Sequence, residues 1–251
     1  MADERRFGGI ARLYGESGAA RIRAAQVAVI GVGGVGSWAV EALARSGIGR
    51  LTLIDMDHVA ESNINRQLPA LEDTLGRLKA EVLAERALQI NSALSVEVVE
   101  AFVDRENLAR MIRSDFDWVV DCIDSFRIKA AMIAHCRRRK QRIISVGAAG
   151  GQTDPTRVRV CDLRRTEQDA LLARTRRLLR REYGFPSNPG RAFGVPVVWS
   201  DEPVRQSQAC EIQQDTSLNC AGYGACMPVT AGFGLAAAGH VLAKLAEAGS
   251  P

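Results

Sequence analysis

Three charged side chains in the first half of the chain have the chemistry needed to handle a phosphate group. Arg66 lies in the run SNINRQ, Lys79 in GRLKAE, and Asp124 in DCIDS. Guanidinium and ammonium groups bind phosphate oxygens, and a carboxylate beside them is a suitable ligand for Mg²⁺. Taken singly, Lys79 could be a solvated helix residue and Asp124 a helix cap. Because they occur together, we predict that Arg66, Lys79 and Asp124 are catalytic and that Asp124 binds the metal.

A glycine-rich turn upstream is typical of nucleotide sites. In VAVIGVGGVGSW, the residues Gly31, Gly33 and Gly36 satisfy the spacing GxGxxG between an expected strand and an expected helix. Such glycines permit a tight turn, and the helix N-terminus offers unpaired N–H groups to a phosphate. Asp55 follows at the end of the next strand, where an acidic side chain accepts the ribose hydroxyls.

The glycine motif alone fits NAD, FAD and ATP equally, so the residues after the second strand decide. A dinucleotide-dependent dehydrogenase has no need of Asn63, Arg66 and Lys79 there, whereas a triphosphate does. We therefore predict ATP and Mg²⁺ as cofactors. The predicted nucleotide-binding residues are Gly31, Gly33, Gly34, Gly36, Asp55, Asp57, Asn63, Arg66, Gln67, Lys79, Asp124 and Ser125.

Strands and helices must alternate to place these residues at one edge of a sheet. Apolar runs predict strands at 26–30, 51–55, 96–99, 118–121, 142–146 and 157–161. Amphipathic runs predict helices at 34–45, 77–90, 105–113, 126–139 and 167–182. This order predicts an α/β fold: a Rossmann-like, doubly wound, mainly parallel sheet with helices on both faces and a C-terminal extension.

The 251 residues fit one domain, 1–251, with a nucleotide-binding core at about 24–150 and a basic, substrate-binding and C-terminal extension at about 151–251. The six cysteines form no CxxC pair, which argues against a structural zinc site and for reduced thiols. The charged N-terminus does not resemble a secretory signal, so we expect a cytoplasmic protein. The uncharged segment 226–243 is poor in Leu and Ile, and we expect a packed helix rather than membrane association.

Positive charge is concentrated in the middle of the chain. Residues 127–191 carry 17 Lys or Arg and 5 Asp or Glu, although the net charge of the whole chain is only +4. Arg174, Arg177 and Arg181 recur at helical spacing, and the run RRRKQR begins at Arg137. A solvated helix exterior would also look like this, but the local excess favours a polyanionic partner.

The phosphate-binding motifs resemble those of ATP-dependent enzymes related to ubiquitin-activating enzyme and to the ThiF/MoeB-like thiamine and molybdopterin adenylyltransferases. The matching runs GVGGVG, LIDMD, SNINRQ, GRLKAE and DCIDS span residues 31–125. The resemblance implies adenylation, in which a carboxylate attacks the α-phosphate of ATP and pyrophosphate leaves. It also implies a homodimer in which an N-terminal arginine reaches the partner's ATP. Arg6 matches the first arginine of that motif, and Gly9 stands where the second would be. Either Arg12 substitutes for the second arginine or the role is absent.

Further runs resemble the tRNA threonylcarbamoyladenosine dehydratases, and they cover nearly the whole chain. They are RFGGIARLYG, SVGAAGGQTDPTRV, DLRRTEQDALLARTRRLL and CAGYGACMPVTAGFG. The resemblance implies that tRNA is the partner, with sulfur-transfer proteins as possible further partners and no role for DNA. The predicted RNA-binding residues are Arg137, Arg138, Arg139, Lys140, Arg174, Arg177 and Arg181.

Three other functions remain open from the sequence. The adenylated carboxylate could be the C-terminus of a sulfur-carrier or ubiquitin-like protein instead of a tRNA nucleoside. The same sheet could serve an NAD-dependent oxidoreductase or a nucleotide-binding scaffold without turnover. ATP–pyrophosphate exchange would distinguish both kinds of adenylating enzyme from the oxidoreductase and the scaffold. Stimulation by tRNA would distinguish a tRNA-modifying enzyme from an enzyme that adenylates a carrier protein.

Overall fold

One seven-stranded sheet organises the molecule in a computed structural model that describes residues 2–188, 190–205 and 223–247. The strand order is β3-β2-β1-β4-β5-β7-β6. Six strands run parallel, and β6 is antiparallel to β7. The bounds are β1 Gln26–Ile30, β2 Arg50–Ile54, β3 Ser95–Val99, β4 Trp118–Asp121, β5 Ile143–Val146, β6 Val158–Asp162 and β7 Pro196–Ser200.

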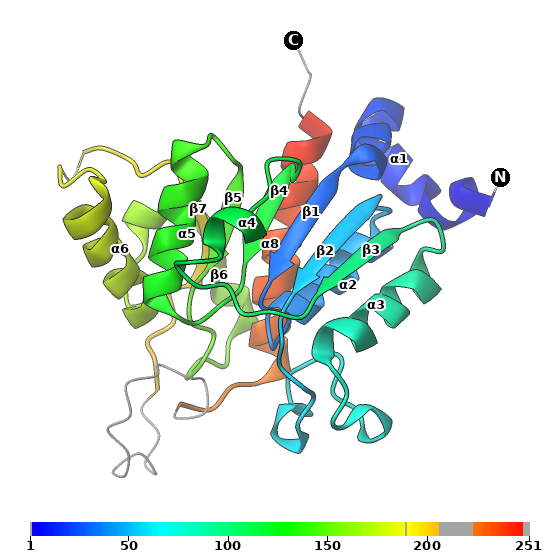
Figure 1. Cartoon of the computed structure of the whole chain (residues 1–251), viewed down its shortest axis with the longest axis horizontal. Helices are drawn as coiled ribbons and strands as arrows, with labels where there is room; N and C mark the ends of the chain where they lie inside the picture. Colours follow the sequence, from blue (N-terminus) through cyan, green and yellow to red (C-terminus); the bar gives the residue numbers. More distant parts are fainter. Residues whose placement is uncertain (1, 189, 206–222, 248–251) are drawn as a thin grey trace.

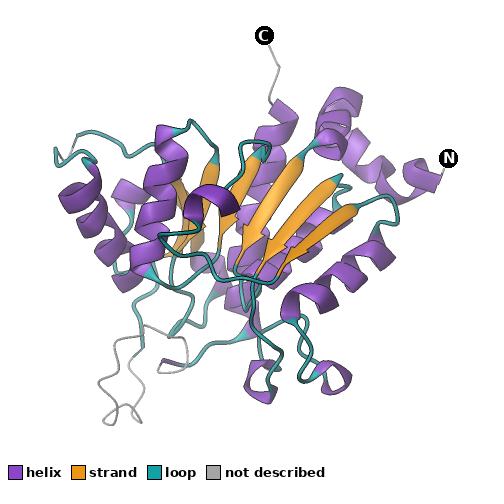
Figure 2. Ribbon diagram, viewed as in Figure 1, coloured by secondary structure: helices purple, strands orange, loops and turns teal. Residues whose placement is uncertain are grey.

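Helices cover both faces of the sheet, as Figures 1 and 2 show. One face is covered by α1 Ala2–Ala24, α2 Gly36–Arg45, α3 Lys79–Ile90 and α8 Met227–Glu247. The other face is covered by α4 Leu108–Met111, α5 Phe126–Arg138 and α6 Ala170–Tyr183. This three-layer arrangement is the predicted Rossmann-like, doubly wound α/β fold.

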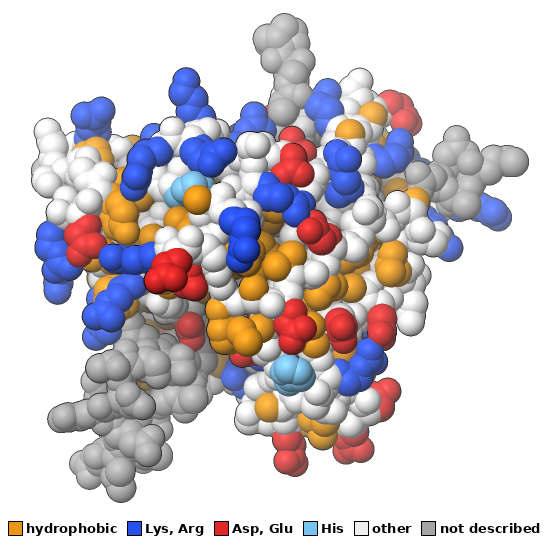
Figure 3. All heavy atoms as spheres, viewed as in Figure 1, with side chains coloured by type: hydrophobic (Ala, Val, Ile, Leu, Met, Phe, Trp, Pro, Cys, Tyr) orange, Lys and Arg blue, Asp and Glu red, His pale blue; other side chains and the backbone are white. Residues whose placement is uncertain are grey.

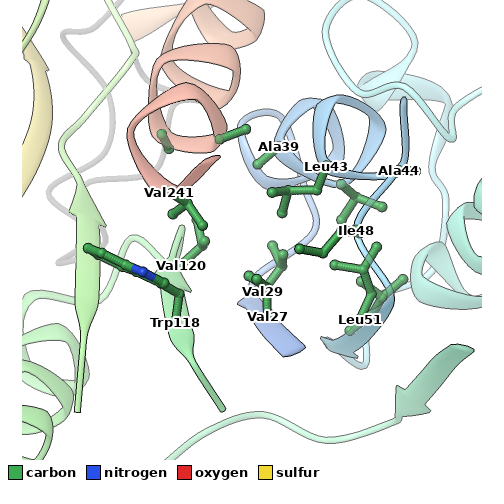
Figure 4. Packing of buried hydrophobic residues seen from close by; sticks show 14 of the residues in the cluster. Val27, Val29, Ala39, Leu43, Ala44, Ile48, Leu51, Trp118, Val120 and Val241 are labelled. Carbon is green, nitrogen blue, oxygen red and sulfur yellow. The ribbon is translucent and has the colours of Figure 1, made fainter. Parts of the chain in front are cut away.

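The alternation of side chains along each strand explains why both faces are buried. In β1, Val27 and Val29 point into the cluster beneath α2 and α8, whereas Ala28 and Ile30 point into the cluster beneath α5. Successive side chains of a strand face opposite sides of the sheet, so a central strand with apolar residues throughout must be covered twice. Figure 4 shows the first cluster, in which Val241 of α8 lies beside Val120 of β4.

The predicted strands are present within one residue of the predicted bounds. The helix predicted at 167–182 begins three residues later, as α6, because Asp169 caps it. Three other elements differ more. The helix expected at 105–113 is only the short α4, Leu108–Met111. The strand β7, Pro196–Ser200, was not predicted because it directly follows a Gly- and Pro-rich segment. The helix α1 was also missed, since it has little amphipathic pattern and is kinked at Gly15, where φ is 73°.

The C-terminal half completes the same sheet. Strands β6 and β7 extend it beyond β5, and α8 packs between α1 and α2. By length and composition, α8 could cross a membrane, yet most of its apolar window is buried against the rest of the fold. We therefore read α8 as a core helix.

Candidate active site

A cavity of about 480 Å³ opens at the carboxyl ends of the central strands. The strand β1 pairs with β2 on one side and with β4 on the other. The chain continues from β1 into α2 on one face and from β4 into α5 on the opposite face, which creates a crevice where ligands bind in open α/β sheets. The predicted residues that line the cavity are Gly31, Gly33, Gly34, Asp55, Asp57, Asn63, Arg66, Gln67, Lys79, Asp124 and Ser125.

Gly36, also predicted to bind the nucleotide, does not line this cavity. A Cβ at Gly36 would lie 1.9 Å from the carbonyl oxygen of Gly31, so this glycine permits the close packing of helix on strand. Gly31 itself has a φ of +80°, and its missing Cβ leaves space next to Cys122 and Ile123. The turn is therefore shaped by Gly31 and Gly36, while Gly33 and Gly34 face the cavity.

Asp55 is buried directly after β2 and stabilises the glycine-rich turn that follows β1. Its carboxylate accepts hydrogen bonds from the backbone N–H of Val32 at 2.7 Å and of Asp57 at 2.8 Å. Burial raises the pKa of Asp55, while those two backbone hydrogen bonds act in the opposite direction. The carboxylate borders the cavity, where it can also accept hydroxyl hydrogen bonds.

Lys79 carries a buried ammonium group at the start of α3. Its Nζ lies 3.0 Å from a carboxylate oxygen of Asp57, and its backbone N–H donates to the Asp57 carbonyl at the same distance. The two bonds hold the Lys79 side chain against the cavity wall. A buried cation in a fixed position can bind phosphate with little loss of side-chain entropy.

The segment around Arg66 is fixed from two helices. The indole Nε1 of Trp38, in α2, donates to the Arg66 carbonyl at 3.1 Å, and the hydroxyl oxygen of Thr230, in α8, lies 3.4 Å from the same oxygen. The Arg66 guanidinium donates to the Ser62 carbonyl at 2.7 Å and to Asn65 at 2.9 Å. Within the described parts of the chain it has no carboxylate partner, so its positive charge remains available at the cavity.

Two amides beside Arg66 have different positions. Asn63 is buried, and its Oδ1 accepts a hydrogen bond from the backbone N–H of Ala60. This bond stabilises the loop between the two residues. Gln67 lies beside Gly33, and its buried Oε1 has no partner among the described atoms. A buried amide oxygen without a partner is costly, and a bound ligand would satisfy it.

Asp124 lies at the mouth of the cavity, and it is not the cap of α5. The residue that precedes the helix is Ser125, and no side chain caps the helix there. The exposed Asp124 carboxylate has no hydrogen bond or ion pair to any described residue. The described residues contain no group of three or more metal-binding side chains. A single carboxylate such as that of Asp124 is compatible with Mg²⁺, because this ion is often held by one or two carboxylates together with phosphate oxygens.

A buried ion pair that the sequence analysis missed supports the Asp124 loop. Lys129, in α5, is fully buried, and its Nζ lies 2.9 Å from Asp121 and 3.2 Å from the Ser145 hydroxyl. Ser145 also donates to the Asp121 carboxylate, whose other oxygen accepts the N–H of Ile123 at 3.3 Å. The network therefore fixes the chain one residue before Asp124. In the sequence, the buried ion pair could have been predicted from the single lysine among the apolar residues of FRIKAAMIA.

Cys122, which is partly exposed, is among the residues that line the cavity. Burial raises the pKa of the Cys122 thiol to about 12, and the neighbouring Asp121 carboxylate contributes in the same direction. A thiol, unlike a thiolate, is a poor nucleophile. Cys122, Cys136, Cys161 and Cys226 form no disulfide, and the remaining two cysteines, Cys210 and Cys220, lie outside the described residues.

The predicted RNA-binding residues lie at different distances from the cavity, because Arg174, Arg177 and Arg181 follow one another along α6. Arg174 is near the cavity end of α6, whose Leu171 lines the cavity. The cluster Arg137–Lys140 is exposed at the opposite end of α5, about 16 Å along the helix axis from its first residue. In Figure 3 the basic side chains gather on the upper and left parts of the visible face, over α5 and α6. The structure therefore does not bring Arg137–Lys140 to the nucleotide cavity.

The N-terminal arginines are far from the nucleotide cavity of their own chain. Arg6 donates to the Ile90 carbonyl at 3.5 Å and to Ser92 at 3.3 Å, beyond the end of α3 that is remote from the cavity. Arg12 is exposed on α1. That either arginine contacts a partner subunit stays a prediction.

Comparison with known proteins supports the interpretation of the motifs. The model of the ThiF family matches residues 8–251. A tRNA threonylcarbamoyladenosine dehydratase of Haemophilus influenzae is 49% identical over 96% of this chain and 94% of its own length. The Escherichia coli K12 protein of the same name is 47% identical over 96% of this chain and 93% of its own length.

A solved structure has the same fold. The crystal structure of the E. coli dehydratase, TcdA, in complex with ATP superposes with a TM-score of 0.89 at 46% identity, covering 97% of this chain and 95% of that one. The similarity extends over the extension 151–251 as well as the nucleotide-binding core. The chain belongs to the ThiF family and, within it, to the tRNA threonylcarbamoyladenosine dehydratases.

Proposed function

We propose that this protein catalyses the ATP-dependent dehydration of threonylcarbamoyladenosine in tRNA. The observation that carries the proposal is the convergence on one cavity of a left-handed glycine turn, two cations and an unpaired carboxylate, in a chain closely similar to dehydratases over almost its whole length. The proposed unit is a single adenylation domain, 1–251, in which the extension completes the sheet of the core.

The cavity has an apolar part suited to the base of ATP and a polar part suited to its phosphates and Mg²⁺. Ile54, Ala101, Phe102 and Val103 form an apolar wall next to Asp55, suited to a base with its ribose. Gly33 and Gly34, together with the cations of Arg66 and Lys79, would bind the phosphates. The Gln67 oxygen, which has no partner among the described atoms, can accept from a hydroxyl or amino group of the nucleotide but not from a phosphate. Asp124 would hold Mg²⁺, which when bound offsets negative charge on the phosphates.

The reaction proceeds in two steps that balance to the loss of one water. A threonyl carboxylate oxygen attacks the α-phosphorus of ATP, and the bond to pyrophosphate breaks. A nucleophilic atom of the carbamoyl group on the same side chain then bonds to the activated carbonyl carbon, the bond from that carbon to the AMP oxygen breaks, and the carbamoyl proton is released to solvent. Lys79 and Arg66 line the cavity and would stabilise charge on the departing pyrophosphate. The ion pair of Asp121 and Lys129 would keep the loop of Asp124 in position.

The alternative, adenylation of a sulfur-carrier or ubiquitin-like C-terminus, receives less support. The chain has no CxxC pair, which adenylyltransferases acting on sulfur carriers usually contain. The proposed partners are tRNA and a second copy of the chain, with sulfur-transfer proteins as possible further partners. The proposed location is the cytoplasm, where tRNA is modified.

Release of AMP and pyrophosphate tests this proposal. Purified protein with ATP and Mg²⁺ is incubated with tRNA carrying threonylcarbamoyladenosine, with the same tRNA lacking the modification, or with a carrier protein ending in Gly-Gly. We expect AMP formation only with the modified tRNA. Pyrophosphate release with the carrier protein, which would leave AMP bonded to the carrier's C-terminus, would overturn the assignment in favour of the alternative.

A further inference from the structure

An aromatic ring flanked by two arginines lies at the rim of the nucleotide cavity. Phe126 is the first residue of α5 and directly follows Asp124 and Ser125, which line the cavity. The guanidinium carbon of Arg127 lies 5.5 Å from the centroid of the Phe126 ring, and that of Arg174, in α6, lies 5.8 Å from it. We call Phe126, Arg127 and Arg174 the rim cluster. It joins two helices at the entrance of the site.

The charges of the rim cluster are available to a ligand. Arg127 and Arg174 are exposed, and neither forms an ion pair within the described parts of the chain. By contrast, Arg113 is paired with Glu97 at 2.8 Å and Arg181 with Glu182 at 2.6 Å. Guanidinium groups without carboxylate partners favour an anionic ligand, and their planar shape also stacks on nucleobases.

The helices that carry the rim cluster are held in position relative to the cavity. The buried carboxylate of Asp169 accepts hydrogen bonds from the N–H of Ala148 at 2.9 Å and of Leu172 at 2.8 Å. These bonds tie the start of α6, the helix of Arg174, to the cavity wall, which includes Ala148 and Leu171. The Phe126 ring packs against the core between α5 and α6. A rigid support of this kind favours recognition because little order is lost on binding.

We propose that the rim cluster binds the single-stranded nucleotides that flank the modified adenosine. The proposal rests on the tRNA function proposed above. Specific recognition of RNA uses unpaired nucleotides, whose bases stack on aromatic rings or guanidinium planes. An adenosine whose side chain enters the cavity places its neighbouring phosphates and bases at the rim, where Arg127 and Arg174 lie. The cluster Arg137–Lys140 is too distant for this role and would contact the tRNA elsewhere.

The test measures binding of an RNA stem-loop that carries threonylcarbamoyladenosine in its loop. Arg127→Gln/Arg174→Gln removes both charges, and Phe126→Leu removes the ring while keeping an apolar side chain. Arg113→Gln is the control, because this half-buried arginine is already paired with Glu97. Fluorescence titration without ATP gives the RNA dissociation constant, and thermal unfolding reports on the fold of each variant.

We expect the double arginine variant to bind the stem-loop roughly 5- to 100-fold more weakly than the wild type. We expect Phe126→Leu to weaken binding by a smaller factor and Arg113→Gln to match the wild type. Equal RNA binding by the wild type and the double variant would overturn the inference, whether or not the wild type turns over. An increase in the KM for ATP without loss of RNA binding would also overturn it, because the arginines would then serve the nucleotide. Failure of the proposed function would show separately, as RNA binding without AMP release.

Discussion

Removing the ammonium group of Lys129 tests the buried ion pair beneath the active site. In Lys129→Met, the fully buried Asp121 loses a cation at 2.9 Å and keeps only Ser145 and the N–H of Ile123 as partners. Breaking a buried pair from one side costs about 3–5 kcal/mol of unfolding free energy, because a charge is left uncompensated. In a chain of this size, each kcal/mol lowers the melting temperature by about 2–4 °C, so we expect a decrease of about 10 °C.

Thermal and urea unfolding, followed by circular dichroism, measure this effect. Asp121→Asn/Lys129→Met leaves no unpaired charge and should recover at least half of the lost stability. Lys244→Met is the control, since Lys244 forms an exposed ion pair with Glu247 and should change stability by about 0.5 kcal/mol or less. A Lys129→Met protein within about 1 kcal/mol of the wild type would refute the argument that this pair holds the loop.

Three further predictions concern the chemistry of the cavity and the basic helix. Asp124→Ala should keep the fold and lower the rate of AMP formation at least about 100-fold, with a much smaller change in ATP affinity; near-normal turnover would show that Asp124 binds no metal. Cys122→Ala should retain activity, and iodoacetamide should leave Cys122 unmodified at pH 8, because burial raises its pKa to about 12; rapid alkylation there would contradict this. Replacing Arg174, Arg177 and Arg181 by Gln should reduce the log–log salt dependence of tRNA binding by about two units. The expected change is below three because Arg181 already contacts Glu182, and an unchanged slope would place the RNA site elsewhere.

Much of the fold was predictable because the nucleotide-binding half has strong local signals. The strands β1, β2 and β4 are short apolar runs between amphipathic helices. The period of the hydrophobic pattern and the length of each apolar run therefore identified them. The strand β7 was hidden, since Pro196 and the preceding glycines indicate a loop, and its pairing with both β5 and β6 is a long-range property. The helix α1 owes its position to packing against α8 rather than to its own pattern.

The site was predictable in composition but not in detail. The motifs named residues that now border one cavity, because parallel strands bring their carboxyl ends together. The sequence could not reveal that Gly36 serves packing or that Lys129 is ion-paired. Nor could it separate Arg174 at the rim from Arg137 at the far end of α5, since that difference arises from the direction of the helices. Local patterns predict which residue types gather, and tertiary packing decides which atoms face the ligand.

Mass spectrometry of nucleosides from treated tRNA tests the central proposal most directly. The protein, ATP and Mg²⁺ are incubated with tRNA that carries threonylcarbamoyladenosine, with reactions lacking ATP or containing the Asp124→Ala protein as controls. The tRNA is then digested under mild conditions, and the modified nucleoside is weighed. We predict that this nucleoside loses the mass of one water in the complete reaction and keeps its mass in both controls. An unchanged nucleoside in the complete reaction, with ATP bound and the protein folded, would contradict the proposed function.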